Sequence, residues 1–214
     1  MGQVRIHNFT VSLDGYATGE GQSLESPFGH AGMRLMSWAF GTHTFQAMHG
    51  EMGDNDELDD SFARRWNDDI GAEIMGRNKF GPQRGAWADE QWQGWWGDNP
   101  PFHTPTFVLT HHVRPSIDMQ GGTTFHFIDA SPAEALAAAR EAAGDRDIRI
   151  GGGPSTVREF LAADLVDFMH VVVAPIVLGR GVRLWDDLET LEERFTIEPT
   201  SSPSGVTHYT FTRR

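Results

Sequence analysis

Three consecutive glycines, followed by a proline and two hydroxyl residues, form the stretch of this sequence best suited to bind a ligand. Glycine permits positive φ values and lacks the Cβ that would hold a ligand away from the backbone. A helix that begins at the proline would direct its unpaired N–H groups and its positive dipole end toward the glycines. This arrangement suits a phosphate, and the alternative is a tight strand-to-helix turn without a ligand. The residues concerned are Gly151, Gly152, Gly153, Pro154, Ser155 and Thr156.

The glycine pattern differs from the two common nucleotide-binding motifs. In the dinucleotide fingerprint G-x-G-x-x-G, an acidic residue follows the next strand, roughly 20 positions on. Here Asp164 and Asp167 precede the next predicted strand, residues 168–174, and no lysine follows the glycines as in a P-loop. The pattern therefore indicates a nucleotide bound by a fold that is neither the common Rossmann type nor a P-loop NTPase.

Charged residues also stand at the ends of two other predicted strands. Arg77 and Lys79, the only lysine of the chain, follow the strand at residues 72–75 and suit a second anionic group of a ligand. A solvated turn is the alternative. Asp14 and Gly15 end the first predicted strand, where Asp-Gly is a strong turn signal. The functional alternative for Asp14 is a carboxylate that faces the ligand.

The histidines are not expected to hold a metal. His43 and His49 are six residues apart and do not share a helical face, and the adjacent His111 and His112 point opposite ways. We expect one histidine of the second pair, together with Thr110, to touch a nucleotide instead.

Composition limits the partners and the compartment. The chain has 17 Lys+Arg against 30 Asp+Glu, a formal net charge of −13, which repels nucleic acid and anionic lipid. It has no cysteine, which excludes disulfides, thiolate metal sites and a cysteine nucleophile. Because neither a signal peptide nor an apolar run of roughly 18 residues is recognisable, we expect a cytoplasmic protein without a membrane partner.

The order of the predicted elements indicates an α/β fold. Strand and helix patterns alternate over most of the 214 residues, which suits one domain with a largely parallel sheet flanked by helices. Two final alternating runs, residues 194–199 and 206–212, predict an antiparallel hairpin at the sheet edge. A hairpin at a sheet edge, with Val206 and Phe211 among its apolar residues, presents unpaired backbone that proteins usually cover, and we therefore expect a homodimer.

Residues 83–103 hold four of the seven tryptophans and have neither helical nor strand periodicity. A packed irregular insertion in the single domain is the favoured interpretation. The alternatives are an aromatic wall of a substrate pocket and an oligomer contact.

Five short motifs, in their order along nearly the whole chain, resemble the dihydrofolate reductase-like superfamily. The similarity is greatest to the reductase domain of the riboflavin-biosynthesis deaminase/reductase (the RibD C-terminal domain) and its stand-alone relatives. The motifs are Ser12-Leu13-Asp14-Gly15, Met75-Gly76-Arg77-Asn78-Lys79-Phe80, Leu109-Thr110-His111, Gly151-Gly152-Gly153-Pro154 and Ala174-Pro175-Ile176-Val177-Leu178-Gly179.

The resemblance implies a three-layer αβα fold, NADPH as hydride donor and often a homodimer. It places the pyrophosphate at the glycines and at the start of the following helix. It implies further that Arg77, Asn78 and Lys79 lie near the phosphates, Thr110 and His111 near the adenosine 2′-phosphate, and Val11, Asp14 and Gly15 beside the nicotinamide. A carboxyl beside a desolvated nicotinamide would have a raised pKa, which makes Asp14 the candidate proton donor.

Two departures from the family pattern concern the substrate. Folate reductases carry a carboxylate on the helix after the first strand, whereas residues 33–40 contain none, so that Asp14, Glu20 or Glu25 would have to substitute. Basic residues for a ribose phosphate, as in the riboflavin reductase, are not recognisable. We therefore expect an NADPH-dependent reductase of a small cyclic or carbonyl-containing substrate. The alternatives are a non-catalytic NADP(H)-binding sensor or scaffold, and a true 5-amino-6-(5-phosphoribosylamino)uracil reductase or folate reductase.

Overall fold

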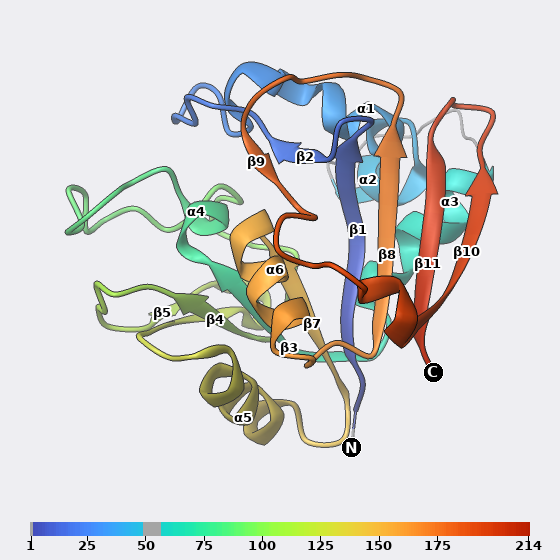
Figure 1. Cartoon of the computed structure of the whole chain (residues 1–214). Helices are drawn as coiled ribbons and strands as arrows, with labels where there is room; N and C mark the ends of the chain where they lie inside the picture. Colours follow the sequence, from blue (N-terminus) through green and yellow to red (C-terminus); the bar gives the residue numbers. More distant parts are fainter. Residues whose placement is uncertain (1, 49–56) are drawn as a thin grey trace. The chain divides into compact units, whose positions relative to one another are not determined.

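The computed structural model of the chain describes residues 2–48 and 57–214 (Figure 1). The chain divides into two compact units, each of which is described by itself. Unit 1 comprises Met1–Arg5 and Asp69–Val166, and unit 2 comprises Ile6–Asp68 and Asp167–Arg214. Strand β1 (Val4–Ser12) begins in unit 1 and continues in unit 2.

Unit 1 is a mostly parallel arrangement of strands with connecting helices. Its elements are β3 (Ile70–Gly76), α4 (Arg77–Phe80), β4 (Pro105–Leu109), β5 (Ile117–Asp118), η3 (Gln120–Gly122), β6 (Thr124–Ile128), α5 (Pro132–Ala143), β7 (Asp147–Gly152) and α6 (Pro154–Ala162). β7 pairs in parallel with the start of β1 and with β3, β3 pairs with β4 and β4 with β6, while β5 is antiparallel to β6. Parallel strands bring their carboxyl ends to one edge, so Gly76, Leu109 and Gly152 end there together.

The two longer helices of unit 1 have end residues of types that favour helix ends. α5 has Ser131 as N-cap, and the Ser131 and Glu134 side chains and backbones form a reciprocal capping box. It ends before Gly144, whose φ of 63° favours glycine. α6 begins at Pro154, in agreement with the preference of proline for the first helical turn.

Unit 2 contains the antiparallel strands near the end of the chain. With the rest of β1 its elements are β2 (Tyr16–Thr18), η1 (Gly29–Met36), α1 (Ser37–Phe40), α2 (His43–Met48), α3 (Glu57–Ala63), η2 (Arg64–Asn67), β8 (Phe168–Ala174), β9 (Val182–Arg183), η4 (Leu191–Arg194), β10 (Phe195–Ser201) and β11 (Thr207–Arg213). β11 pairs antiparallel with both β8 and β10, and β8 lies beside β1. The predicted hairpin is therefore confirmed, with β10 as its outer strand.

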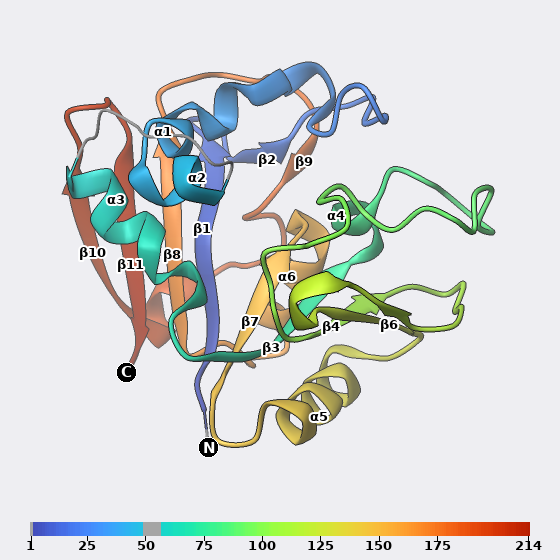
Figure 2. The same cartoon turned by 180° about the vertical axis from the view of Figure 1, so that it is seen from behind.

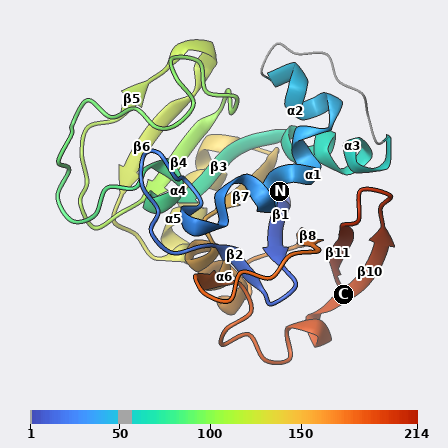
Figure 3. The same cartoon turned by 90° about the horizontal axis from the view of Figure 1, so that it is seen from above.

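The side chains expected at the edge of this hairpin are not exposed. Val206 and Phe211 are 3% and 7% exposed. Val206 packs with Trp38, Ala63 and Val172 under α1 and α3, which cover the strands of unit 2 in Figure 2. Seen from above in Figure 3, α1, α2 and α3 lie together. These apolar residues therefore stabilise their own chain and do not form a free apolar edge.

A chain of buried polar groups crosses the interior of unit 2. Nε2 of His208 lies 2.7 Å from Asp59 Oδ1, and Nε2 of His170 lies 3.0 Å from His208 Nδ1. The backbone N–H of Asn8 donates to His170 Nδ1 at 3.2 Å, and the Phe62 ring stacks on both imidazoles. Burial and the neighbouring charge of His208 lower the pKa of His170 well below its usual value of 6.5. Burial therefore favours the neutral form of His170.

Two short strands have no counterpart among the predicted elements. β2 and β9 pair with each other, and two or three residues are too few to show a period. Of the residues considered in the sequence, His49 lies outside the described residues.

In residues 2–48 and 57–214, no helix is long and apolar enough to cross a membrane. Within the same ranges, no group of three or more His, Cys, Asp or Glu residues has the arrangement of a metal site.

Candidate functional site

The three glycines after β7 have different physical roles. A Cβ at Gly151 would collide with the carboxylate of Glu73 and the ammonium of Lys79. Gly152 is buried, and its φ of 110° is a conformation that other residues rarely adopt. At Gly153, with an ordinary φ of −75°, an added Cβ would meet no atom of the described residues within 4 Å. Gly153 therefore has the open space that was expected for the loop, whereas Gly151 does not.

The first turn of α6 has no side-chain cap, unlike the first turn of α5. Its N-cap is Gly153, and no side chain caps it. The N–H of Val157 donates to the Gly153 carbonyl at 3.0 Å. Ser155 is exposed at the turn, whereas Thr156 is buried with its hydroxyl packed against Gly76. The backbone of this turn and Ser155 thus suit an anion, and the Thr156 hydroxyl serves packing.

Arg77, the first residue of α4, lies beside Thr110 at the end of β4. Its Nη1 donates to the carbonyl of Gly85 at 2.5 Å and to the Thr110 hydroxyl at 3.4 Å. Its guanidinium carbon lies 3.8 Å from the centre of the Trp87 ring, a cation–π contact. Its buried Nε and Nη2 find no hydrogen-bond partner within residues 2–48 and 57–214. The structure thus brings the predicted site residues Arg77 and Thr110 together. Two N–H groups of Arg77 remain able to donate to a ligand.

Two further arginines close to Arg77 were not predicted. Burial and then the charge of Arg84 lower the pKa of Arg77, and burial and then the charge of Arg77 lower that of Arg114. Arg114 stacks on Trp87 from 4.2 Å and donates to the Trp92 carbonyl at 2.5 Å. Sequence spacing shows no sign of this cluster, because the irregular segment that assembles it has no period.

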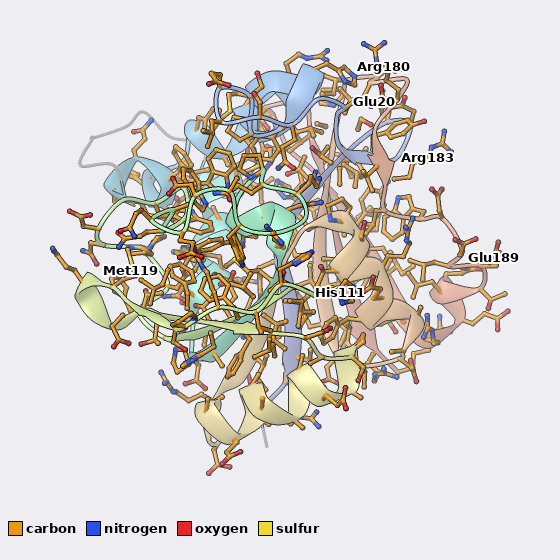
Figure 4. All side chains as sticks on the ribbon, turned by 90° about the vertical axis from the view of Figure 1, so that its left-hand side faces the viewer. Glu20, His111, Met119, Arg180, Arg183 and Glu189 are labelled. Atoms are coloured by element: carbon orange, nitrogen blue, oxygen red, sulfur yellow. The ribbon has the colours of Figure 1, made fainter. Side chains whose placement is uncertain are left out.

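Asn78 and His111 are turned toward other partners. The Asn78 amide oxygen accepts a hydrogen bond from Arg84. The His111 side chain is 90% exposed, and its Nδ1 lies 2.8 Å from Asp129 Oδ1 (Figure 4). Thr110 accepts a hydrogen bond from Arg77, whereas His111 contacts Asp129, and its place near a 2′-phosphate stays a prediction.

Lys79 has a carboxylate partner within the chain. Its Nζ lies 2.8 Å from Glu73 Oε1, and Arg149 hydrogen-bonds the other oxygen of the same carboxylate. The side chains of Glu73 and Arg149 are 0% and 4% exposed, whereas that of Lys79 is 26% exposed. Burial lowers the pKa of Lys79 from 10.5 to about 7 and that of Arg149 to about 9. Charged residues inside two otherwise apolar strands were the available sequence signal for this pair.

In unit 2, Asp14 joins the turn after β1 to the loop after β8. Its carboxylate accepts hydrogen bonds from the Ser12 hydroxyl at 2.6 Å and from the backbone N–H groups of Leu178 and Gly179 at 3.1 and 2.7 Å. The Ser12 bond is the largest influence and, with the backbone bonds, it lowers the Asp14 pKa to about 2. The donors around Asp14 stabilise its charged form and hold its pKa below the usual value, whereas a rise was predicted for Asp14 beside a bound nicotinamide.

The structure also shows the surroundings of the other residues predicted beside the nicotinamide and of the two alternative acids. Gly15 has a φ of 84°, which explains the glycine of the turn. A Cβ added at this position would lie 3.3 Å from the Trp185 ring. Val11 is 1% exposed in β1, so only its backbone could contact a ligand. Of the two other acids considered, Glu20 pairs with Arg180 at 3.3 Å (Figure 4), and Glu25 accepts from the Ser23 hydroxyl.

Comparison with known proteins points to one family. The family model for the RibD C-terminal domain matches residues 5–207. Three solved structures match 100% of this chain. They are a provisionally assigned riboflavin biosynthesis protein from Shewanella sp. PV-4 (21% identity, 99% of that chain, TM-score 0.60), a pyrimidine reductase-like protein from Corynebacterium diphtheriae (15%, 92%, 0.53), and dihydrofolate reductase from Enterococcus faecalis complexed with NADP(H) (15%, 97%, 0.53). A search of curated proteins finds no match.

The α/β fold, mostly parallel with antiparallel strands near the C-terminus, is that of dihydrofolate reductase. The match to the family model extends over nearly the whole chain. The chain therefore belongs to the RibD C-terminal domain family.

Proposed function

We propose that this protein is an NADPH-dependent reductase of a small cyclic or carbonyl-containing substrate. Membership of the RibD C-terminal domain family implies NAD(P)H-dependent reductase chemistry in general. The observation that carries the proposal is the first turn of α6, which has no side-chain cap and lies beside the open space at Gly153. Such a turn offers backbone N–H groups to the phosphates of a dinucleotide.

Residues of unit 1 would hold the phosphates. The Gly153 backbone and the first turn of α6 would bind the pyrophosphate, and Arg77 would bind the 2′-phosphate with Thr110 beside it. A buried donor without a partner is costly, so a phosphate oxygen that reached Nε or Nη2 of Arg77 would be bound favourably. This assignment favours NADPH over NADH, because NADH lacks the 2′-phosphate.

The chemistry supplied by bound NADPH is the transfer of a hydride from the nicotinamide. The protein itself would hold the nicotinamide and the substrate in contact. The backbone at Val11 and Gly15 remains our candidate for the neighbour of the nicotinamide. Because its pKa of about 2 keeps Asp14 ionised at neutral pH, we assign the proton that the reduced substrate needs to water.

A second candidate function is a non-catalytic NADP(H)-binding sensor or scaffold. The ionisation of Asp14 favours it, because this carboxylate cannot act as an acid at neutral pH. Measuring NADPH oxidation with a panel of pterins, pyrimidinones, quinones and enones separates the candidates. Tight binding of NADPH without oxidation by any acceptor would favour the sensor or scaffold. Oxidation by a dihydropterin or by the riboflavin-pathway pyrimidine would instead identify a folate or pyrimidine reductase.

Calorimetry with NADPH and with NADH tests the cofactor assignment. We expect tighter binding of NADPH, and a loss of roughly 10- to 100-fold in NADPH affinity on Arg77→Ala, the range for a charge-assisted hydrogen bond. The NADH affinity of Arg77→Ala should change little. Arg180→Ala is the matched control, since Arg180 lies in unit 2 and is paired with Glu20. Equal affinities for the two cofactors would contradict the assignment.

We also propose a cytoplasmic homodimer. The support for the dimer is the outer strand β10, whose free side presents backbone groups that proteins usually cover. Because Val206 and Phe211 are buried in their own chain, the contact would depend on the backbone of β10. Light scattering at micromolar concentration tests it, and a monomer would exclude it.

A further inference from the structure

Leu178, in the loop that follows β8, is hydrogen-bonded on both sides of its backbone by residues far from it in the sequence. Its N–H donates to Asp14 Oδ1 at 3.1 Å, and its carbonyl oxygen lies 3.3 Å from Nε2 of His30. Leu178 is 8% exposed and packs with Ala31 and Leu35 of η1. The turn after β1 and the helix η1 thus both hold this residue.

The hydrogen bonds of His30 determine which of its ring nitrogens donates to Leu178. The backbone N–H of Glu20 donates to His30 Nδ1 at 2.9 Å. Because a ring nitrogen that accepts a hydrogen bond carries no proton, the ring proton is on Nε2, from which it is donated to the Leu178 carbonyl. One side chain therefore connects the segment after β2 with the loop after β8.

Two glycines permit the close approach of His30 to Glu20. A Cβ at Gly19 would collide with the His30 ring, and a Cβ at Gly29 would collide with the Glu20 carbonyl. Gly29 also has a φ of 59°, a conformation that other residues rarely adopt. The backbone N–H of His30 donates to the same Glu20 carbonyl at 2.9 Å. The residue types on both sides of this contact therefore fit it.

An ion pair joins the same two segments at the surface. Arg180 Nε lies 3.3 Å from Glu20 Oε2, and the two side chains are 65% and 64% exposed (Figure 4). Exposed ion pairs contribute little to stability, because water screens their charges. His30 is half-buried, so its hydrogen bonds are the stronger connection between the segments.

The loop after β8 is also bound to the turn that we place beside the nicotinamide. The N–H of Leu13 donates to the Ile176 carbonyl at 2.9 Å, and the N–H of Gly179 donates to the Asp14 carboxylate at 2.7 Å. Gly15 is the next residue of this turn. A shift of the loop would therefore displace the backbone of the turn.

We propose that His30 is a positioning residue for the nicotinamide end of the cofactor. The inference rests on the proposed function, in which the backbone at Val11 and Gly15 is beside the nicotinamide. By holding the Leu178 carbonyl, His30 keeps the loop after β8 in the position from which it supports the Asp14 turn. Without that bond, the loop and the turn become ordered only when the nicotinamide binds, and this ordering lowers the affinity for NADPH.

Two ligands separate the nicotinamide end of the cofactor from its phosphates. NADPH carries both, whereas adenosine 2′,5′-bisphosphate carries the 2′-phosphate and one further phosphate but no nicotinamide. Calorimetry on the whole protein gives the affinity for each ligand. In the wild-type protein we expect NADPH to bind more tightly, and the ratio of the two affinities reports on the nicotinamide end.

Two amide variants each retain one of the two side-chain bonds of His30. In His30→Asn the amide takes the place of Nδ1 and accepts from Glu20, whereas in His30→Gln it takes the place of Nε2 and donates to Leu178. His30→Asn should lower NADPH affinity roughly 2- to 10-fold, the range for one hydrogen bond, without changing the affinity for adenosine 2′,5′-bisphosphate. His30→Gln should restore the wild-type ratio. Arg180→Ala, which breaks the exposed ion pair between the same segments, is the matched control and should not alter the ratio.

The loop can also be followed in the wild-type protein, so the test does not depend on the folding of a variant. Binding of NADPH should slow amide hydrogen exchange in residues 176–179, because the nicotinamide orders the turn that holds this loop. Adenosine 2′,5′-bisphosphate, which lacks the nicotinamide, should leave the exchange of these residues unchanged.

The outcomes distinguish this inference from the proposed function. An unchanged affinity ratio in His30→Asn overturns the inference, and so do equal losses for the two ligands, which indicate a role in folding alone. Equal effects of the two ligands on exchange in residues 176–179 have the same meaning. In each of these cases the binding of NADPH leaves the proposed function standing. Failure of the wild-type protein to bind NADPH overturns both.

Discussion

The Arg77 guanidinium lies 3.8 Å from the centre of the Trp87 ring, so the irregular tryptophan segment positions the cation that we assign to the 2′-phosphate. Trp87 is itself held by a hydrogen bond from Nε1 to the His112 carbonyl at 2.6 Å and by Arg114 on its ring. Residues 83–103, which the sequence analysis interprets as a packed insertion, thus also have a role in the candidate site.

Replacement of Trp87 should reduce the discrimination between the two cofactors. Trp87→Leu removes the aromatic face under Arg77, and a cation–π contact contributes about 0.5–2 kcal/mol. We expect NADPH affinity to fall by roughly 2- to 30-fold while NADH affinity changes little. Trp95→Phe, in the same segment, is the control, because the Trp95 ring packs against Trp92. Equal losses for both cofactors would show that Trp87 acts on the segment as a whole.

Two neighbouring glycines should respond differently to alanine. Gly153→Ala places a methyl group in open space at an ordinary φ, so we expect an unchanged melting temperature. The same methyl would stand where the phosphate approaches the backbone, which should lower NADPH affinity at least about tenfold. Gly151→Ala would push against Glu73 and Lys79 and should destabilise the fold by about 1–3 kcal/mol. Wild-type affinity in a folded Gly153→Ala protein would exclude this phosphate site.

Asp14→Asn should reveal a structural carboxylate. With a pKa lowered to about 2, Asp14 stabilises the fold above the pKa of the unfolded chain, near 3.8, and this contribution is lost as the pH falls from about 4 to 2. The stability difference between wild type and Asp14→Asn should thus be constant from pH 5 to 8 and shrink below pH 4. Urea unfolding over this range measures it. A stability difference that changed near pH 7 would instead show that the pKa of Asp14 is raised.

The buried His170 should make the fold sensitive to mild acid. It stays neutral in the folded protein, while in the unfolded chain it binds a proton near pH 6.5. Stability should therefore be unaffected above about pH 7 and fall below pH 6.5 by up to about 1.4 kcal/mol per pH unit.

A glutamine at position 170 tests this titration. Its amide can donate to His208 and accept from Asn8, but it binds no proton. We expect His170→Gln to be less stable at pH 7.5 and to lose stability less steeply between pH 6.5 and 5. Parallel stability curves for the two proteins over that range would assign the acid sensitivity to other groups.

Much of the fold was determined by local sequence signals. Ser131, Pro132 and Gly144 set the ends of α5 because capping and helix-breaking depend on residues a few positions apart. The terminal hairpin and the largely parallel arrangement of the strands in unit 1 followed from the strand and helix patterns of the sequence in the same way. The glycine loop, Arg77 and Thr110 were likewise recognisable, since each stands at the end of a predicted strand.

The contacts of these residues depend on the tertiary structure. Asp14 and Gly179 are 165 positions apart, and their hydrogen bond fixes a pKa that turn chemistry alone could not indicate. Glu73 meets Arg149 across two strands that are neighbours only after folding, so the burial of Lys79 beside Gly151 had no local signal. Electrostatic interactions depend on distance through space and on exclusion of water, and neither quantity is contained in the spacing of residues along the chain.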